Sequence, residues 1–191
     1  MNIFESNAER YDRWYEKNRE LYEMELSVIP KSESPSLEVG VGTGRFAVIG
    51  IDVGVDTSSA MLKIAKRRGV ECIRADAGHL PFRDRVFKSV YMIFTLCFLD
   101  EPVKALSEVK RILRDDGFFV VCIIPRNSGL GEEYAGKDSP FYRVAKFYTE
   151  DEVVNMLRNA GFDIIDVRKT RLKYSENDFV CFTAKHRNNR V

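Results

Sequence analysis

A cluster of three glycines that directly follows a short apolar segment is the feature that most narrows the possible folds of this chain. Ser36–Val39 has the composition of a buried strand, and Gly40-Val41-Gly42-Thr43-Gly44 comes immediately after it. Glycines at such a strand-to-helix turn let backbone N–H groups approach a ligand that side chains would block, although glycine clusters also serve tight turns. The third glycine lies one position too early for the G-x-G-x-x-G pattern of dinucleotide sites. The spacing therefore disfavours a nicotinamide oxidoreductase and favours a ligand without a pyrophosphate.

Short apolar segments alternate with amphipathic segments along most of the 191 residues. Two of them, Val86–Phe94 and Phe118–Ile124, are nearly continuous apolar runs, which is typical of parallel strands with both faces covered. This alternation predicts an α/β fold with a doubly wound sheet. The predicted strands are Ser36–Val39, Val53–Asp56, Glu71–Ala75, Val86–Phe94, Phe118–Ile124, Ile164–Val167 and Phe179–Ala184. Predicted helices cover one or two segments within 7–28, then 60–68, 102–113 and 150–160, and a turn is expected over 114–117.

Composition and charge exclude several classes of protein. The 30 Lys and Arg residues nearly balance the 29 Asp and Glu residues, so no broad basic field is available to attract a nucleic acid. The longest apolar runs fall short of the roughly 18 to 20 residues that span a bilayer. The first residues lack the pattern of a secretory signal. We therefore expect a cytoplasmic protein with a small-molecule partner, without nucleic acid or membrane, and the oligomeric state stays open.

The four cysteines are spread along the chain at Cys72, Cys97, Cys122 and Cys181. They form no C-x-x-C pair and have no histidine at metal-ligand spacing. Most of them lie inside apolar runs. We expect buried free thiols and no metal site.

An acidic residue ends the second predicted strand at Asp56, 18 positions after Glu38. In doubly wound sheets a carboxylate at this place accepts hydrogen bonds from ribose hydroxyls. Asp56 could instead cap the helix that follows it. Asp52 is a rival carboxylate, but it stands at the start of the strand, away from the ligand-bearing carboxyl ends.

Four motifs, taken together and in their order along the chain, are specific enough to indicate a protein family. They are Glu38 to Gly44, Asp56 followed by Ser58-Ser59-Ala60-Met61-Leu62, then Asp76-Ala77-Gly78-His79-Leu80-Pro81-Phe82, and finally Arg111-Ile112-Leu113-Arg114-Asp115-Asp116-Gly117. Together they resemble the class I S-adenosylmethionine-dependent methyltransferases, in particular the small-molecule type found in ubiquinone and menaquinone biosynthesis. The resemblance implies a Rossmann-like fold of seven mostly parallel strands with an antiparallel last strand. It covers about residues 7 to 185, with an unusually short first crossover, so the helix over 45–50 is expected to be a single turn.

The resemblance implies S-adenosyl-L-methionine as the cofactor and no metal. The residues that it marks as cofactor-binding are Tyr11, Glu38, Gly40, Gly42, Gly44, Asp56, Thr57, Asp76, Ala77, Leu80 and Thr95. Among these, Glu38, Gly40 and Gly42 would line the methionine end and Asp56 would bind the ribose. Asp76 would accept a hydrogen bond from the adenine amino group, beside the backbone N–H of Ala77. Walls of the adenine slot would come from Thr57 and Leu80.

Residues for the methyl acceptor are not marked by any motif. The aromatic N-terminal segment, with Tyr11, Trp14 and Tyr15, resembles a helix that covers the cofactor in relatives, or else it simply packs in the core. We expect the acceptor pocket in the insert Pro125 to Tyr148, because loops at strand carboxyl ends carry ligands. The candidates for a catalytic group are Tyr11 and His79, although His79 also fits a solvated loop residue.

We therefore expect one methyltransferase domain over residues 1–191. Its parts would be an N-terminal helical lid (1–30), a cofactor-binding half (36–124) and an acceptor-site insert with the final helix and strands (125–185). The expected function is in-line methyl transfer to a small-molecule acceptor. The alternative is a catalytically silent module that binds S-adenosylmethionine or S-adenosylhomocysteine and serves regulation or a partner protein.

Overall fold

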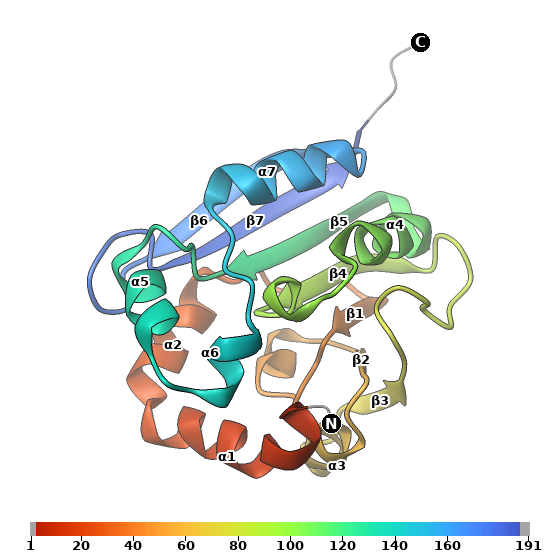
Figure 1. Cartoon of the computed structure of the whole chain (residues 1–191). Coiled ribbons are helices and arrows are strands. Elements are labelled where there is room, and N and C mark those ends of the chain that lie inside the picture. Colours follow the sequence, from red (N-terminus) through yellow and green to blue (C-terminus); the bar gives the residue numbers. More distant parts are fainter. Residues whose placement is uncertain (1–2, 188–191) are drawn as a thin grey trace.

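Seven strands form one sheet in the computed structural model, which describes residues 3–187 (Figure 1). Their order across the sheet is β3-β2-β1-β4-β5-β7-β6. All neighbours from β3 to β5 are parallel, whereas β7 runs antiparallel to both β5 and β6. The predicted fold class, a doubly wound and mostly parallel sheet with an antiparallel last strand, is confirmed. The strands are β1 (Ser36–Val39), β2 (Val53–Asp56), β3 (Glu71–Arg74), β4 (Phe87–Ile93), β5 (Leu113–Ile123), β6 (Phe162–Thr170) and β7 (Phe179–His186).

Helices cover both faces of the sheet. The α-helices are α1 (Ile3–Lys17), α2 (Arg19–Val28), α3 (Ser59–Arg67), α4 (Pro102–Ile112), α5 (Gly129–Gly136), α6 (Pro140–Val144) and α7 (Glu150–Asn159), and the 3₁₀ turns are η1 (Phe46–Ile49) and η2 (Leu96–Phe98). The predicted single-turn crossover is confirmed as η1. Thr149 and Glu152 form a capping box at the start of α7, because the Thr149 hydroxyl accepts from the Glu152 N–H at 3.2 Å and the Glu152 carboxylate accepts from the Thr149 N–H at 2.7 Å.

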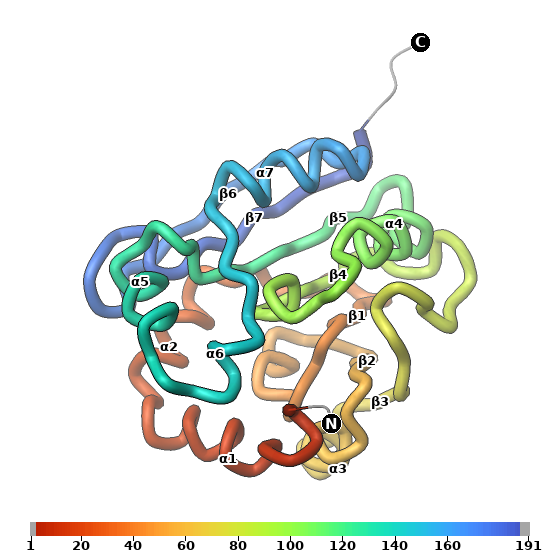
Figure 2. The backbone as a smooth tube through the Cα atoms, in the orientation of Figure 1, coloured from red at the N-terminus to blue at the C-terminus, as the bar shows by residue number. Residues whose placement is uncertain are grey.

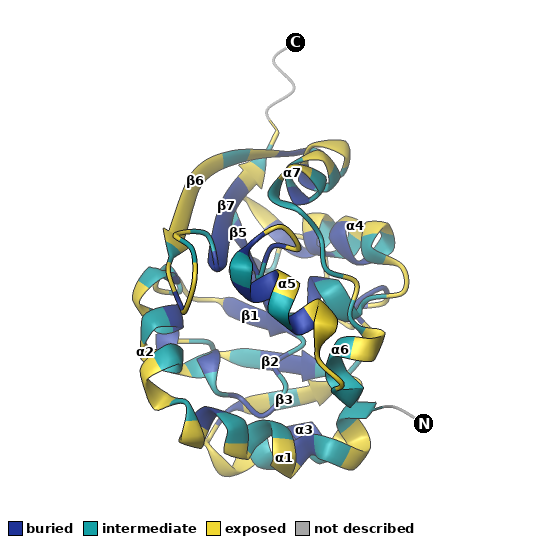
Figure 3. Cartoon of the chain, turned by 60° about the vertical axis from the view of Figure 1, so that its left-hand side comes forward, coloured by how far each residue is buried: buried dark blue, intermediate teal, exposed yellow. Residues whose placement is uncertain are grey.

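Alternating side chains of the central strands build a core on each face. Val90 and Met92 of β4 join the core that α4 and α7 cover. Tyr91 and Ile93 point to the other face, where α1, α2, η1 and α5 lie. This two-residue period is the one that a strand between two layers requires. Figure 3 shows buried residues concentrated on the strands between the layers.

The predicted turn over 114–117 is wrong, because these residues belong to β5. Leu113 pairs with Phe87 and Phe118 pairs with Ser89, so the four residues between them form an irregularity in the ladder. The apolar pattern stops at Leu113 and resumes at Phe118, which makes such an excursion look like a turn in the sequence. Strands β6 and β7 also extend beyond the predicted 164–167 and 179–184.

The expectation of four free thiols is corrected for two cysteines. Cys122 of β5 and Cys181 of β7 lie directly opposite each other in the antiparallel ladder and form a disulfide. Cys72 and Cys97 are free, and each is partly buried. In the part of the chain that the structure describes, His, Cys, Asp and Glu side chains form no group of three or more that could hold a metal ion. Within residues 3–187, none of the helices has both the length and the apolar character needed to cross a membrane.

The N-terminal helices, traced in red in Figure 2, lie on the same face of the sheet as η1, which follows the glycine loop (residues 40–44). Asp12 of α1 accepts hydrogen bonds from Arg45 at 2.8 Å and from Arg68 at 2.8 Å. The two guanidinium groups hold the pKa of Asp12 below its usual value against the effect of burial. Glu5 accepts from the Ser58 hydroxyl at 2.7 Å, at the start of α3. Helix α1 is therefore attached through Glu5 and Asp12 to the elements that follow β1 and β2.

Candidate functional site

The carboxyl ends of β1, β2 and β4 and the loop after β3 open onto one cavity of about 640 Å³. We call it the glycine-loop cavity, and α1 lies over it with Ile3, Phe4 and Tyr11. It lies where β1 is flanked by β2 and β4, which is the place where the chain reverses its winding and where such sheets bind ligands. The predicted residues in its lining are Tyr11, Gly40, Gly42, Asp56, Thr57, Asp76, Ala77 and Thr95.

The glycine loop has the backbone conformation that its glycines permit. Gly40 has φ +76°, and a Cβ there would collide with the side chain of Thr95. Gly42 has φ +52° and faces open space, with the Tyr11 ring as the nearest neighbour of an added Cβ at 3.9 Å. A side chain at Gly42 would therefore enter the open space next to the loop, whereas one at Gly40 has no room beside Thr95. Thr95 is itself held in place because its hydroxyl donates to the carbonyl of Val39 at 3.0 Å.

Asp56 stands at the end of β2 and bonds to two backbone groups. One carboxylate oxygen accepts from the Gly42 N–H at 3.0 Å, and the other accepts from the Ser58 N–H at 2.8 Å. Burial raises the pKa of Asp56 above its usual value, although these hydrogen bonds oppose the effect. The helix-capping hydroxyl of α3 belongs to Ser58, which accepts from the Met61 N–H at 3.2 Å. Asp56 therefore connects the glycine loop to the start of α3 and still faces the cavity.

The loop after β3 brings Asp76 and Ala77 to the cavity but leaves His79 outside its lining. Asp76 accepts from the Gly78 N–H at 2.8 Å, and most of its carboxylate stays exposed. The His79 side chain is 72% exposed, so it points toward solvent. Leu80 is buried in the core beneath the loop, where its N–H donates to Glu108 at 2.7 Å.

The cavity lining does not include Gly44, at the end of the glycine loop, or Glu38, just before it. Gly44 has φ +78°, and an added Cβ would press on Ala65 and Val70 at 3.1 Å, so this glycine allows α3 to pack closely. Glu38 is 1% exposed, and its Oε2 has no hydrogen-bond partner within residues 3–187. Burial, together with the nearby Asp56 charge, raises the pKa of Glu38 well above its usual value.

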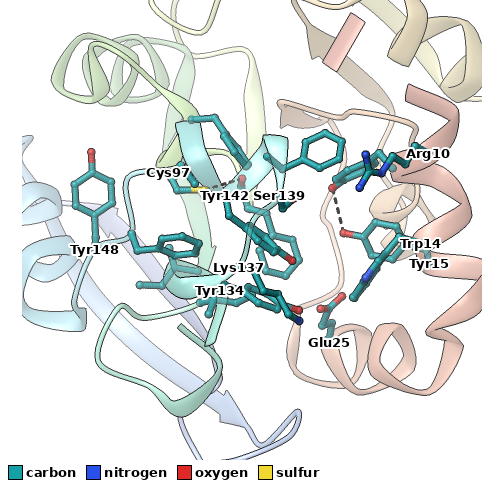
Figure 4. A pocket seen from close by; sticks show the side chains of 18 residues that line it. Arg10, Trp14, Tyr15, Glu25, Cys97, Tyr134, Lys137, Ser139, Tyr142 and Tyr148 are labelled. Atoms are coloured by element: carbon teal, nitrogen blue, oxygen red, sulfur yellow. Dashed lines mark hydrogen bonds between the residues drawn. The ribbon is translucent and has the colours of Figure 1, made fainter. Parts of the chain in front are cut away.

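A second cavity of about 310 Å³ adjoins the first and is lined mainly by aromatic rings (Figure 4). We call it the aromatic cavity, and it shares Tyr11, Phe94 and Phe98 with the glycine-loop cavity. Phe94 has φ +56°, a strained conformation for a residue with a side chain and one that often occurs at functional sites. The insert between β5 and α7 supplies much of the other wall, with Tyr134, Phe141, Tyr142, Phe147 and Tyr148.

Tyr11 stands at the junction of the two cavities. Its hydroxyl lies 3.1 Å from that of Tyr15, one helical turn further along α1. Burial raises the pKa of Tyr11 above its usual value, so the phenol stays protonated at neutral pH. It is therefore suited to donating a hydrogen bond and poorly suited to acting as a general base.

Glu25 is a site residue that the sequence-based reasoning missed. It lies on α2, is 2% exposed, lines the aromatic cavity, and carries an Oε2 without a hydrogen-bond partner among the described residues. Burial raises its pKa to about 8. A signal exists in the sequence, because Glu25 comes four residues after Leu21 and three after Tyr22, on the apolar face of its helix.

Comparisons with known proteins agree with this geometry. Residues 37–121 match the model of the Methyltransferase domain family. A crystal structure from Thermotoga maritima, described as a SAM-dependent methyltransferase and possible histamine N-methyltransferase, has a TM-score of 0.87 and 34% identity, over 97% of this chain and 99% of that one. The chain belongs to the class I S-adenosylmethionine-dependent methyltransferases. Its cofactor, as a member of this family, is S-adenosyl-L-methionine.

Two curated relatives are also similar to this chain over most of its length. An uncharacterised protein of Methanocaldococcus jannaschii is 38% identical, over 97% of this chain and 99% of its own length. A demethylmenaquinone methyltransferase of Thermotoga maritima is 27% identical, over 86% of this chain and 88% of its own length. The predicted resemblance to methyltransferases of the menaquinone type is therefore confirmed at the level of the family.

Proposed function

We propose that this protein transfers a methyl group from S-adenosylmethionine to a small-molecule acceptor that binds in the aromatic cavity. The observation that carries the proposal is the junction of the two cavities. Tyr11, Phe94 and Phe98 line both, so the two cavities lie side by side and would hold their ligands close to each other. Holding two reactants in contact and in line supplies much of the acceleration of a displacement reaction.

The glycine-loop cavity fits the cofactor on three observations. At Gly42 the glycine loop leaves open space that a side chain would fill. Asp56 accepts from the backbone N–H groups of Gly42 and Ser58, and because a carboxylate has about four acceptor positions it keeps capacity for a ribose hydroxyl. Next to the loop, Glu38 keeps an unpartnered oxygen among residues 3–187, which the ammonium group at the methionine end of the cofactor would stabilise.

The other predicted cofactor residues would contact the adenine or set the shape of the glycine loop. Asp76 has one oxygen engaged by the Gly78 N–H and remains largely exposed, so it is free to accept from the adenine amino group. Ala77 and Thr57 line the same part of the cavity, with Leu80 packed below. Gly44 and Thr95 act indirectly, because they set the shape of the glycine loop.

The bound cofactor supplies a methyl group on a sulfonium sulfur, a leaving group that needs no proton. The task of the protein is then to align the acceptor and to exclude water at the junction. Helix α1 performs this task in the proposal: it acts as a lid whose Tyr11 ring separates the junction from solvent. Of the two candidate catalytic residues, Tyr11 fits an orienting role, and the exposed His79 belongs to the lining of neither cavity.

The identity of the acceptor is a separate question. One of the two Thermotoga maritima proteins is described with the amine histamine as its possible substrate, and the other is named for the quinone demethylmenaquinone. The aromatic lining of this chain suits a small molecule with an unsaturated or apolar skeleton. In this proposal the whole chain acts as one methyltransferase domain in the cytoplasm.

Calorimetric titration tests cofactor binding. We expect S-adenosylmethionine and S-adenosylhomocysteine to bind and NAD not to bind. Asp56→Ala should weaken S-adenosylhomocysteine by about 1 to 3 kcal/mol, the usual loss for hydrogen bonds to a charged group. Asp52→Ala is the matched control, because Asp52 bonds to Ser36 at the opposite end of β2. Tight NAD binding, or equal affinity of the Asp56→Ala and wild-type proteins, would contradict the proposed site.

Methyl counting tests catalysis. The protein is incubated with methyl-labelled S-adenosylmethionine and a panel of metabolites, and transferred label is measured. Transfer to one class of compound identifies an enzyme. Cofactor binding without transfer to any acceptor would instead favour the silent regulatory module.

A further inference from the structure

Glu25 is the buried carboxyl group of the aromatic cavity, and the fold leaves one of its oxygens without a partner. It is 2% exposed, and its Oε2 accepts no hydrogen bond from any residue within 3–187. Buried ionisable groups without partners are costly, so their presence in a cavity lining points to a ligand that completes them. We propose that the ligand of the aromatic cavity carries a protonated amine that pairs with the Glu25 carboxylate. This inference rests on the proposed function, because it names the chemical class of the acceptor.

The rings around Glu25 fit an ammonium group. In Figure 4 the Glu25 carboxyl lies between Trp14 and Tyr15 of α1 on one side and Tyr134 of α5 on the other. Tyr134 stacks on Tyr142 with ring centroids 4.3 Å apart, which keeps this wall in a fixed orientation. Aromatic faces attract cations, and a desolvated cation between several rings and one carboxylate gains from both interactions.

The other charged groups of the lining stand at its edge. Arg10 and Lys137 are exposed, and Lys137 forms an ion pair with Glu133. The Lys137 ammonium also lies 5.0 Å from the centroid of the Tyr134 ring, so this wall already binds one cation on the protein itself. Inside the cavity the buried Glu25 is therefore the group that determines which charge a ligand should carry. A negatively charged acceptor would face this carboxyl group.

The protonation state of Glu25 gives the amine a measurable signature. Burial raises the pKa of Glu25 to about 8, so the free protein holds this group mostly as the neutral acid at pH 7. The tyrosines around it, Tyr11, Tyr15, Tyr134 and Tyr142, all have a pKa raised by burial and stay neutral. An arriving ammonium favours the ionised form of Glu25, which must then release its proton to solvent. A neutral ligand gives no such release.

The position of Glu25 separates its role from the reaction itself. It lines the aromatic cavity but does not belong to the lining of the glycine-loop cavity, and the two meet at Tyr11, Phe94 and Phe98. The amine would thus be held outside the glycine-loop cavity, while another atom of the same molecule faces the methyl donor. Glu25 is in this sense a positioning residue that selects the acceptor.

Three probes with one phenyl ring and a short side chain test the inference by calorimetry, with saturating S-adenosylhomocysteine. They are 2-phenylethylamine, 2-phenylethanol and 3-phenylpropionate. We expect the wild-type protein to bind the amine about tenfold or more tightly than the alcohol, and the propionate most weakly. Glu25→Gln should abolish the preference for the amine and leave the affinity of the alcohol unchanged. Glu23→Gln, an exposed neighbour on the same helix, should keep the preference.

Proton release provides a second readout, measured by repeating the titrations in buffers of different ionisation enthalpy. From a pKa of about 8, amine binding at pH 7 should release about 0.9 proton from the wild-type protein and none from Glu25→Gln. The inference is overturned if 2-phenylethylamine binds no better than the alcohol, if Glu25→Gln retains the preference, or if the wild-type protein releases no proton. The proposed function fails separately, if the wild-type protein does not bind S-adenosylhomocysteine in the first titration.

Discussion

Replacing Glu25 with glutamine should stabilise the protein, and increasingly so as the pH rises. Glu25 is 2% exposed and has a pKa of about 8 in the folded chain, against an ordinary value of 4.5. Between these two values the folded state binds more protons than the unfolded state, so the free energy of unfolding falls as the pH rises. The stability that the neutral acid provides is fully present below about pH 4.5 and is lost by about pH 8. Glutamine does not titrate, so the variant lacks this decline.

The size of the effect follows from the two pKa values. One pH unit within this window corresponds to about 1.4 kcal/mol per group. Integrated from pH 5 to pH 8, the stability of Glu25→Gln relative to the wild-type protein should rise by about 3.5 kcal/mol. Glu38 also has a raised pKa, but it is present in both proteins and cancels from the difference.

Urea unfolding at pH 5, 6, 7 and 8, without cofactor and with the disulfide intact, measures this difference. Glu23→Gln serves as the control, because the Glu23 side chain is 61% exposed and pairs with Arg19 at the surface. Its stability relative to the wild-type protein should stay level across the same range. A Glu25→Gln difference that changes by less than about 0.5 kcal/mol between pH 5 and pH 8 would refute the argument that Glu25 is buried as the neutral acid.

Two further predictions concern the cofactor side. Gly40→Ala should lower the affinity for S-adenosylhomocysteine about tenfold or more, because the added Cβ collides with Thr95 and φ is +76°. Gly69→Ala is the control, because Gly69 has φ +81° but open space around it. This control should cost about 1 kcal/mol of stability and leave binding intact. Equal affinity of the two variants would contradict the role of the glycine loop. Hydrogen exchange should slow at residues 8–18 when S-adenosylhomocysteine is added, with no change in α7; protection at 40–44 alone would mean that α1 is purely structural.

The parts of the fold and of the cofactor side that can be predicted from the sequence are those set by local sequence patterns. A strand, a glycine turn and a carboxylate at the next strand end, such as Val39, Gly42 and Asp56, are positioned by neighbours a few residues away and by the common edge of a parallel sheet. Their juxtaposition follows once the winding is known. The short crossover η1 and the capping box at Thr149 are likewise determined by chain length and by i to i+3 spacing.

Contacts between distant segments are decided by the tertiary structure. Cys122 and Cys181 meet because β7 inserts between β5 and β6 in antiparallel register, and 59 residues separate them in sequence. His79 belongs to a predicted motif, yet the path of its loop turns the side chain outward.

The aromatic cavity also depends on local sequence patterns and on contacts between distant segments. The spacing from Leu21 and Tyr22 puts Glu25 on the apolar face of α2, but whether this residue faces a cavity depends on what packs opposite. Tyr15 comes from α1 and Tyr134 from the insert, more than a hundred residues further along the chain, and their approach turns a buried carboxyl into one that faces a cavity. Sequence periodicity reports which face of an element is covered, whereas the space left between covering elements depends on how their side chains pack.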